Sequence, residues 1–336
     1  MATSPTVLVT GATGFIGRRL ALRLAQRYRI RALVRPGEDP AAIPELAGLG
    51  DRLDVVVADV TEAGAVAAAA AGTRRVYHLA AVVGDWGPAE LFERVNVGGT
   101  RNVLEAAVGA RCERVVMVSS IVVYGSQLRT GPCDEDAPRE RGIGPYGRTK
   151  RRSEEIALDY HAFGRVPVAV VRPGNVYGPG SGLWVDELAR QLRRGLGMWL
   201  DDGAGDAGLA YVDNVVDVIA RAGETAAAAG RIYNAADGAG VTWKQYITDI
   251  AAAAGAPTPH RSLPTAVAKA AASALESAWR ATRRPHRPLL TREAVQIFAS
   301  RPPLPITRAT TELGYTPLSY GHALDRVRTY LQERPS

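Results

Sequence analysis

The feature that most constrains this chain is a set of three glycines directly after its first apolar segment. The run "TVLVT" at Thr6 to Thr10 leads into Gly11, Gly14 and Gly17, and then into the helical pattern "GRRLALRLAQRY". The chain must turn tightly there, and only residues without a bulky Cβ let the backbone approach a ligand closely. Backbone N–H groups at the start of the helix can then bind a pyrophosphate. The pattern predicts a strand, a dinucleotide phosphate loop and a helix, rather than an ordinary glycine-rich turn.

Apolar runs alternate with helical patterns along the first half of the chain. Further buried strands are expected at 30–34, 53–57, 75–79, 114–118 and 168–171. Such alternation is typical of a parallel sheet covered on both faces. The predicted fold is therefore α/β, a Rossmann-type doubly wound parallel sheet. Residues 1–180 are assigned to this domain, to which 208–236 return, whereas 181–207 and 237–336 are expected to form a smaller, partly interleaved substrate-binding region.

Composition argues against several other classes of protein. The net charge of +7 comes from scattered arginines with no block of like charges, which argues against nucleic-acid binding. The two cysteines, Cys112 and Cys133, give no disulfide framework and lack metal-ligand spacing, so no metal is expected and a reducing cytoplasm fits. No stretch reaches the roughly 18 apolar residues of a membrane span. We expect a cytoplasmic protein, not integral to a membrane, that acts on a small molecule.

Tyr146 and Lys150 stand four residues apart in "YGRTK". Lysine is rare in this chain, since only three of the 41 basic residues are lysines. A helix places positions i and i+4 on one face, so the phenol and the ammonium would lie side by side. A tyrosine titrates near 10 when free, and a neighbouring ammonium lowers that pKa. The pair suits proton transfer, although on these two residues alone a chance pairing on a surface helix is equally acceptable.

The order of short motifs along the chain resembles the extended short-chain dehydrogenase/reductase family. The motifs are "TGATGFIG", "ADV" at 58–60, "YHLAA" at 77–81, "NVGGTRNVLEAA" from Asn96, "VSSIVVYG" from Val118, "YGRTK", "RPGNVYGPG" from Arg172 and "YVDNVVD" from Tyr211. The resemblance covers nearly the whole chain. It runs closest to the branch of the 3-beta-hydroxysteroid dehydrogenases and dihydroflavonol reductases.

The resemblance implies a set of catalytic residues. Tyr146 would be the acid/base, Lys150 would tune it and bind the cofactor ribose, and Ser120, rather than Ser119, would bind the substrate oxygen. Asn96 corresponds to a position that supports the lysine and a water in a proton relay, although it reads equally well as a helix cap.

The cofactor site is expected along the ends of the strands. An arginine after the second strand suits the 2′-phosphate of NADP(H), so Arg35 favours NADP(H), while Glu38 or Asp39 leaves NAD(H) open. Asp59 is expected beside the adenine, or as a cap. The full set is Gly11, Thr13, Gly14, Phe15, Ile16, Gly17, Arg35, Asp59, Val60, Leu79, Ala80, Ala81, Tyr146, Lys150 and Pro173.

Departures from the family pattern narrow the reaction. Ser120 is followed by Ile121, Val122 and Val123, which cannot move the additional protons of a dehydration. No arginine occurs from 195 to 220, where Asp201, Asp202 and Asp206 would repel a sugar diphosphate. The leading prediction is an NADP(H)-dependent oxidoreductase that interconverts a ketone and a secondary alcohol on a hydrophobic, cyclic small molecule. The candidate pocket residues, each of which could equally be core, are Val82, Val83, Trp86, Ser120, Ile121, Asn175 and Trp184.

Two other functions remain open from the sequence. One is an NAD-dependent nucleotide-sugar epimerase that recycles its hydride internally, and the other is an NADP(H)-sensing regulatory protein. The helix expected from Leu263 to Thr282 covers the pocket or makes a weak membrane-surface contact. A homodimer through the helices after Asn96 and Tyr146 is expected from the resemblance, although both helices could bury their apolar faces internally.

Overall fold

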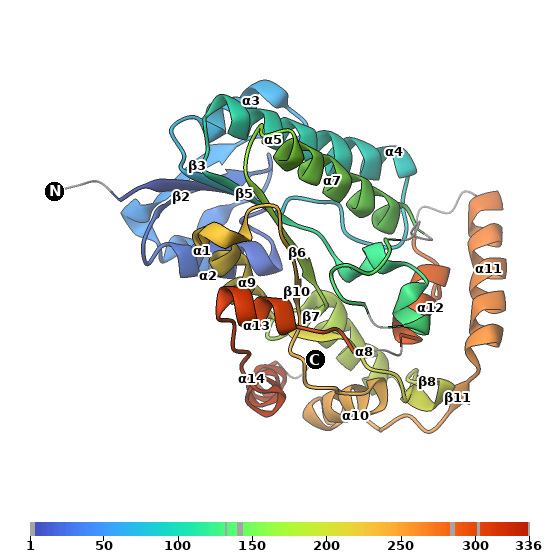
Figure 1. Cartoon of the computed structure of the whole chain (residues 1–336). Coiled ribbons are helices and arrows are strands. Elements are labelled where there is room, and N and C mark those ends of the chain that lie inside the picture. The colour runs from blue at the N-terminus through green and yellow to red at the C-terminus, as the bar shows by residue number, and fades with distance from the viewer. Residues whose placement is uncertain (1–3, 132, 140–143, 283–285, 301–302, 335–336) are drawn as a thin grey trace.

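The computed structural model describes residues 4–131, 133–139, 144–282, 286–300 and 303–334. Within this part of the chain, seven parallel strands form the central sheet in the order β10-β6-β5-β4-β1-β2-β3 (Figure 1). They are β1 (Thr6–Thr10), β2 (Arg29–Val34), β3 (Leu53–Val57), β4 (Arg75–His78), β5 (Arg114–Val118), β6 (Val168–Pro173) and β10 (Ile232–Ala235). The predicted Rossmann-type doubly wound parallel sheet is confirmed.

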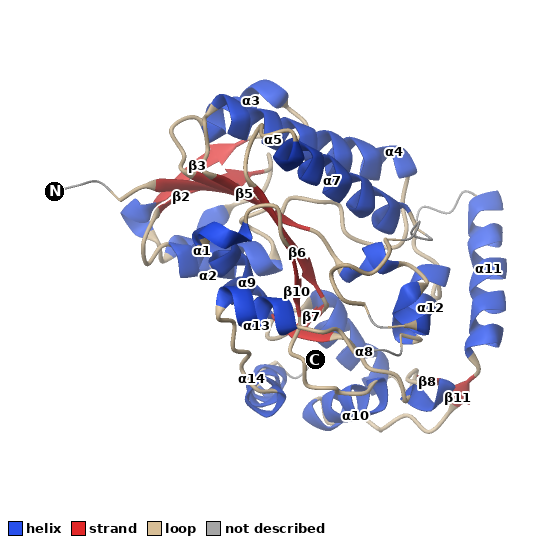
Figure 2. Cartoon of the chain, viewed as in Figure 1, coloured by secondary structure: helices blue, strands red, loops and turns tan. Residues whose placement is uncertain are grey.

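The residues of β1 show why both faces of the sheet are covered. Successive strand residues point to opposite faces, so Leu8 packs into one core while Val7 and Val9 pack into the other. The Leu8 side is covered by α3 (Ala63–Ala70), α5 (Gly99–Gly109) and α7 (Pro145–Ala162), and the opposite side by α1 (Phe15–Leu24) and α9 (Val212–Glu224). Figure 2 shows the strands between these two helical layers.

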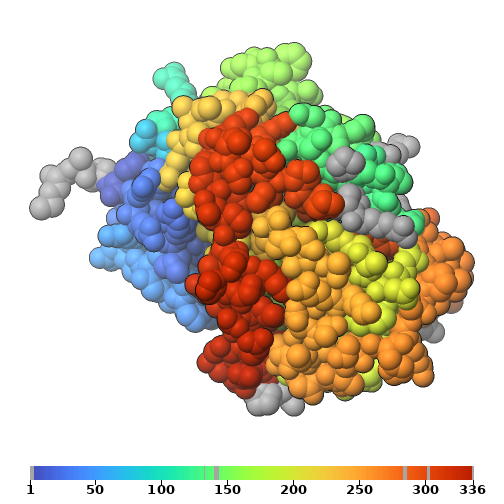
Figure 3. All heavy atoms as spheres, turned by 60° about the horizontal axis from the view of Figure 1, so that its bottom comes forward, coloured from blue at the N-terminus to red at the C-terminus, as the bar shows by residue number. Residues whose placement is uncertain are grey.

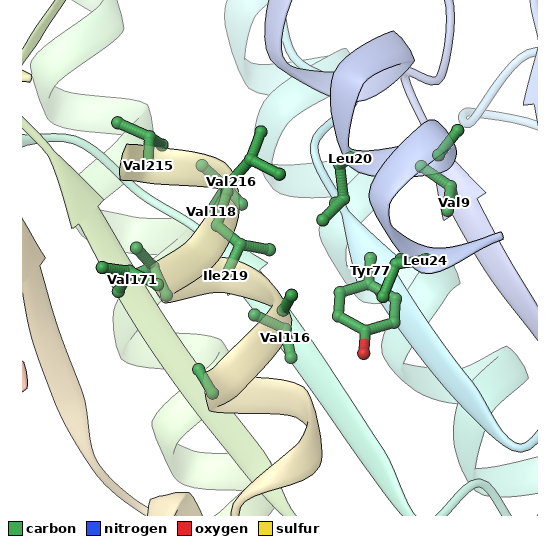
Figure 4. Packing of buried hydrophobic residues seen from close by; sticks show 14 of the residues in the cluster. Val9, Leu20, Leu24, Tyr77, Val116, Val118, Val171, Val215, Val216 and Ile219 are labelled. Carbon is green, nitrogen blue, oxygen red and sulfur yellow. The ribbon is translucent and has the colours of Figure 1, made fainter. Parts of the chain in front are cut away.

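Close packing holds the second of these layers together. Leu20 and Leu24 of α1 lie near Val9 and Tyr77, while Ile219 of α9 lies near Val116 of the sheet (Figure 4). All of these side chains are almost completely buried. Fully burying a residue of this kind contributes about 1.5–3 kcal/mol relative to leaving it exposed. The apolar faces of α5 and α7 are likewise buried inward against the sheet.

The strand order creates a crevice at the carboxyl ends of the strands. From β1 the chain runs outward to β2 and β3, and then returns to place β4 on the other side of β1. The connections on the two sides of this point leave in opposite directions, which opens a space between β1 and β4. In folds of this kind the ligand lies there, so the glycine loop after β1 is at the expected position.

A smaller part of the molecule lies beyond these strand ends. β7 (Asn175–Tyr177) pairs with β9 (Leu209–Tyr211), and β8 (Trp199–Leu200) pairs with β11 (Ser262–Leu263). The helices of this part are α8 (Leu188–Arg193), α10 (Trp243–Ala253), α11 (Thr265–Ala281), α12 (Arg292–Phe298) and α14 (Tyr320–Gln332), whereas α13 (Thr307–Leu313) packs on α9 and β10. Figure 3 shows the C-terminal residues, in red, spread over one face between the blue N-terminal residues and the orange ones.

Short elements complete the chain. The short helices are α2 (Pro44–Ala47), α4 (Ala89–Phe92) and α6 (Gln127–Thr130), and single 3-10 turns occur at Pro40–Ala42, Gly50–Arg52, Ile121–Tyr124, Asp201–Gly203 and Ala226–Ala228. Wider, π-type turns occur at Glu93–Gly98 and Gly182–Glu187. Among the helices that the structure describes, none is long and apolar enough to cross a membrane.

Candidate active site

The glycine loop packs so closely that side chains would not fit. Gly11 has a φ of +69°, and a Cβ there would lie 2.9 Å from the Ala80 nitrogen. A Cβ on Gly17 would overlap the Gly11 carbonyl oxygen. Gly14 is the N-cap of α1, and the first turn of that helix contains no acidic residue. The start of α1 is therefore suited to an anion, and this cradle fits the pyrophosphate of a dinucleotide. Phe15 and Ile16, also predicted here, pack toward the core of the smaller part.

Glu38 links the glycine loop to Arg35 at the end of β2. Its carboxylate accepts a hydrogen bond of 2.7 Å from Thr13 Oγ1, and it pairs with Arg35 at 2.6 Å. Burial alone would raise the pKa of Glu38, but the hydrogen bonds from Thr13 and Arg35 outweigh it and the pKa is lowered. The Arg35 side chain is 69% exposed. The cation expected at this position is present, and a carboxylate lies beside it.

The other predicted adenine and strand-end residues have clear local partners. Asp59 Oδ1 accepts a hydrogen bond of 2.8 Å from the Thr61 backbone nitrogen, which lowers the pKa of Asp59. The N-cap of α3 is Glu62, so Asp59 closes the turn before that helix and does not cap it. Val60 is buried against Gly99, where a Cβ would lie 2.8 Å from Val60 Cγ1. Pro173 is buried at the last position of β6. Ala81 lies in the partly buried loop after β4.

Sequence reasoning missed the polar group that joins the ends of β1 and β4. Thr10 Oγ1 accepts hydrogen bonds from the backbone nitrogens of Leu79 at 3.2 Å and Ala80 at 3.1 Å, and it lies 2.8 Å from His78 Nδ1. His78 Nε2 lies 3.1 Å from Thr100 Oγ1. Burial lowers the pKa of His78 to about 3, so its ring is neutral. This group is structural, and it holds the crevice edge in position.

Ser120, Tyr146 and Lys150 come together where β5 ends and α7 begins. Tyr146 is in the first turn of α7, Lys150 follows one turn later, and Ser120 caps the turn after β5. Burial raises the pKa of Tyr146, a hydrogen bond with Ser120 acts to lower it, and the Glu293 carboxylate raises it. The Lys150 Nζ lies 5.9 Å from the centre of the Tyr146 ring.

The electrostatic expectation for this pair differs from the structure. We expected the ammonium to lower the pKa of the phenol, but burial dominates both groups. The pKa of Lys150 is lowered to about 8 by burial, against the attraction of Glu154. Its Nζ donates a hydrogen bond of 2.8 Å to the carbonyl oxygen of Val118, the last residue of β5. The ammonium is thus held at the strand end, facing the space between β5 and α7.

A buried ion pair supports this strand end from behind. Glu154 pairs with Arg172, and both side chains have no exposed surface. Ser119 Oγ donates a hydrogen bond of 2.8 Å to Glu154 Oε2. The two adjacent serines therefore take separate partners, since Ser119 bonds the buried carboxylate while Ser120 bonds the phenol.

Asn96 holds a loop rather than contacting the lysine directly. Its side chain accepts from the Val82 nitrogen at 2.7 Å and donates to the Val82 oxygen at 3.1 Å and to Thr149 at 3.0 Å. The main-chain carbonyl oxygen of Asn96 accepts hydrogen bonds from the Thr100 hydroxyl at 2.6 Å and from the Ser153 hydroxyl at 2.9 Å. Asn96 thereby fixes the loop after β4 to α7.

Of the candidate pocket residues, Ile121 and Asn175 both lie beside Gly208, where a Cβ would be 3.8 Å from each side chain. Ile121 is buried with Tyr124 and Leu304, and Asn175 Nδ2 donates to the Ala207 oxygen at 2.7 Å. Trp184 packs in an aromatic cluster, where its ring centre lies 5.5 Å from that of Trp243 and 5.6 Å from that of Phe298.

The loop residues of the predicted pocket lie elsewhere. Trp86 lies under the Arg280 guanidinium of α11, 5.4 Å from its ring centre, whereas Val83 is 72% exposed. Nearby, Asp85 accepts hydrogen bonds from Arg287 and Thr291. The loop after β4 is therefore tied to the C-terminal segment.

Glu293, at the start of α12, is the second group that sequence reasoning missed. Its side chain is 7% exposed, and a Cβ on Gly144 would overlap its Oε2. Burial, followed by the charge of Asp85, raises the pKa of Glu293 to about 8. Nothing in "LTREAVQIF" distinguishes this acid from an ordinary first-turn glutamate after the N-cap Thr291. Its position depends on contacts between segments far apart in the chain.

Known proteins are similar to this chain in sequence and in fold. The model of the NAD dependent epimerase/dehydratase family matches residues 7–236. A 4-hydroxy-2-methyl-3-oxo-4-farnesyl-3,4-dihydroquinoline-1-oxide ketoreductase of Stigmatella aurantiaca is 30% identical over 95% of each chain. A 2-alkyl-3-oxoalkanoate reductase of Stenotrophomonas maltophilia is 29% identical over 96% of this chain and 98% of its own. The crystal structure of gox2253 superposes with a TM-score of 0.81 at 27% identity, covering 98% of both chains.

Proposed function

Since the chain belongs to the NAD dependent epimerase/dehydratase family and is an NAD(P)-dependent oxidoreductase, we propose that it interconverts a ketone and a secondary alcohol on a hydrophobic, cyclic small molecule. The observation that carries the proposal is the hydrogen bond between Ser120 and Tyr146, one helical turn from Lys150. These groups lie at the strand-end edge that also carries the glycine loop, so a bound dinucleotide and the phenol share one crevice.

The side chains divide the work of proton transfer. Tyr146 Oη gives its proton to the substrate oxygen during reduction and takes one back during oxidation. Ser120 Oγ donates a hydrogen bond to that oxygen as negative charge develops on it. The hydrogen bond between Ser120 and Tyr146 directs both hydroxyl groups toward the position of the substrate oxygen. When bound, the nicotinamide supplies or accepts the hydride.

Lys150 provides the positive charge of the site. The ammonium on Val118 stabilises a phenolate at Tyr146 electrostatically and offers two further N–H donors to a ribose. Glu154 lies one turn further along α7 and, since its charge raises the pKa of Lys150, keeps the ammonium charged. The buried pair of Glu154 with Arg172 holds that carboxylate in place.

For the cofactor, the glycine loop would hold the pyrophosphate and Arg35 a 2′-phosphate, so our proposal is that NADP(H) is preferred. Support comes from the largely exposed Arg35 guanidinium, which the Glu38 bridge keeps beside Thr13. An incoming phosphate would replace Glu38 on Arg35 and gain a charge-assisted bidentate contact. NAD(H) is the alternative cofactor, because the Glu38 carboxylate at the same position could instead accept hydrogen bonds from the ribose hydroxyls.

One experiment tests the reaction and its alternatives together. We would purify the protein without added cofactor, identify any retained dinucleotide by mass spectrometry, and titrate it with NADPH and NADH. We would then assay a panel of cyclic ketones, with Tyr146→Phe as the control. Exchangeable NADPH and ketone turnover that depends on Tyr146 are the expected results. Tightly retained NAD without net ketone reduction would contradict the proposal and favour an epimerase, while cofactor binding without any turnover would favour a sensor.

A further inference from the structure

Glu293 lies where three separated segments meet beside the candidate active site. Its helix, α12, is tied to the loop after β4 because Thr291 donates to Asp85. The same helix is tied to the segment after β5 because Gln296 donates to the Gly125 carbonyl oxygen. The third segment is the start of α7, which carries Tyr146. When Glu293 is ionised, its charge raises the pKa of that phenol.

The carboxyl group is buried, and among the described residues its Oε2 has no hydrogen-bond partner. Only 7% of the residue is exposed. Leaving a buried polar atom unpaired costs about 1–3 kcal/mol. Such an atom needs an explanation in a folded chain, and beside an active site a ligand that completes its hydrogen bonding is one.

Gly144 makes room for this carboxyl group. It has an ordinary extended backbone, with φ of −95° and ψ of 173°, that any residue can adopt. Its glycine is required by space alone, since a Cβ would overlap Glu293 Oε2 and lie 2.9 Å from Cδ. The carboxyl group therefore lies directly against the N-cap of α7, two residues before Tyr146.

Burial favours the neutral form of Glu293. Asp85 and Glu276 disfavour the carboxylate and Arg148 and Arg287 favour it, but burial is the largest effect and raises the pKa of Glu293 to about 8. At neutral pH the group is mainly a carboxylic acid. Such an acid donates one hydrogen bond and suits an uncharged oxygen acceptor better than an anion.

Building on the function proposed above, we propose that Glu293 binds a second oxygen of the substrate, a few bonds from the reacting carbonyl carbon. The preferred substrates would then be cyclic ketones that carry another carbonyl or hydroxyl group nearby, rather than ketones with a single oxygen. Ser120 and Tyr146 hold the reacting oxygen, and Glu293 selects the orientation by holding the other. A substrate that lacks the second oxygen would leave the buried Glu293 side chain without a hydrogen-bond partner. The free-energy cost of that unpaired group is what would make the site select substrates with two oxygens.

The test uses pairs of ketones that differ by one oxygen. In each pair, a cyclic 1,3-diketone that cannot enolise at the carbon between its two carbonyl groups, such as 2,2-dimethyl-1,3-cyclohexanedione, is compared with its monoketone, 2,2-dimethylcyclohexanone. We expect Glu293→Ala to lower kcat/KM for the diketones by about 10- to 100-fold and to leave the monoketones within about twofold, from the cost of an unmade hydrogen bond. Glu293→Gln keeps a donor and should retain most of the preference. The remote Glu312→Gln serves as the matched control.

A second variant tests the geometry without removing the acid. Gly144→Ala should displace the carboxyl group and reproduce the selective loss, and it should add nothing in the Glu293→Ala background. An equal loss for both ketone classes in Glu293→Ala, or an unchanged preference in correctly folded variants, overturns this inference and leaves the reductase intact. Failure of the wild-type protein to reduce either class with either cofactor overturns the proposed function and this inference with it.

Discussion

Replacing Lys150 with methionine should make the cofactor-free protein more resistant to unfolding near neutral pH. Lys150 is 5% exposed, and burial lowers its pKa from 10.5 to about 8. This difference corresponds to roughly 3 kcal/mol by which the native state disfavours the charged form. Methionine has a similar length and no charge, so the Lys150→Met variant avoids this penalty. It leaves the Val118 carbonyl oxygen without its donor, which costs about 1–3 kcal/mol.

The sign of the pH dependence follows from proton binding. Between about pH 8 and 10.5 the unfolded lysine keeps a proton that the native lysine has lost, so the wild-type protein becomes more stable as the pH rises. Below that window both states are protonated and the whole penalty applies. Relative to Lys150→Met, the wild-type free energy of unfolding should rise by about 3 kcal/mol across the window.

Urea unfolding of both proteins without cofactor, followed by circular dichroism at several pH values from 7 to 10.5, measures this difference. Taking the difference between the two proteins cancels the other groups that titrate in the same range. Parallel stability curves would refute the reasoning, because they would mean that Lys150 is not desolvated in the native state. The same variant should lose ketone turnover. The lysine would then be a case in which stability is given up for function.

Four other substitutions test separate parts of the structure. Tyr146→Phe should lower turnover by about 10²- to 10⁴-fold with NADPH binding retained, and unchanged kinetics would remove Tyr146 from the chemistry. The wild-type protein should lose stability as the pH rises from about 4.5 to 8, because the pKa of Glu293 is higher in the native state than in the unfolded state. Glu293→Gln should abolish this loss, which urea unfolding at pH 5 and pH 8.5 measures. Arg35→Ala should weaken NADPH binding about tenfold or more and NADH binding little, as read by fluorescence titration, and equal losses would argue against a phosphate contact. Gly17→Ala should lower Tm and prevent dinucleotide binding, because its Cβ would overlap the Gly11 carbonyl oxygen; a stable variant that still binds would contradict the loop geometry.

Much of the fold could be predicted because its signals are local. The run from Thr6 to Thr10 becomes β1, and the predicted strands at 53–57 and 114–118 have the observed bounds. β1 and β5 are short apolar runs buried on both faces, whereas β3, at the edge of the sheet, leaves Val55 and Val57 exposed. In all three the apolar run identifies the strand without knowledge of its neighbours. The spacing of Tyr146 and Lys150 is equally local, since one helical turn brings them onto the same face.

Predictions that depended on neighbouring segments were less informative. The sequence left Trp184 open as pocket lining or as core, and in the structure its ring packs against Trp243 and Phe298, which come from α10 and α12. The sequence alone does not distinguish a tryptophan that lines a pocket from one that packs in the core, because the difference depends on which other segments surround it. The division of the chain into domains and the expected homodimer stay predictions.

The amino-acid sequence by itself indicated the strands, the glycine loop and the pairing of Tyr146 with Lys150, because hydrophobic period, steric freedom and helical spacing act over a few residues. Ser120 was implied by the family resemblance. Only the tertiary structure decided which charges the site contains. It placed Glu38 between Thr13 and Arg35, and it brought Glu293 from the C-terminal part against the start of α7. The pKa values of Tyr146, Lys150 and Glu293 were decided there as well, because desolvation depends on every segment that excludes water from a group.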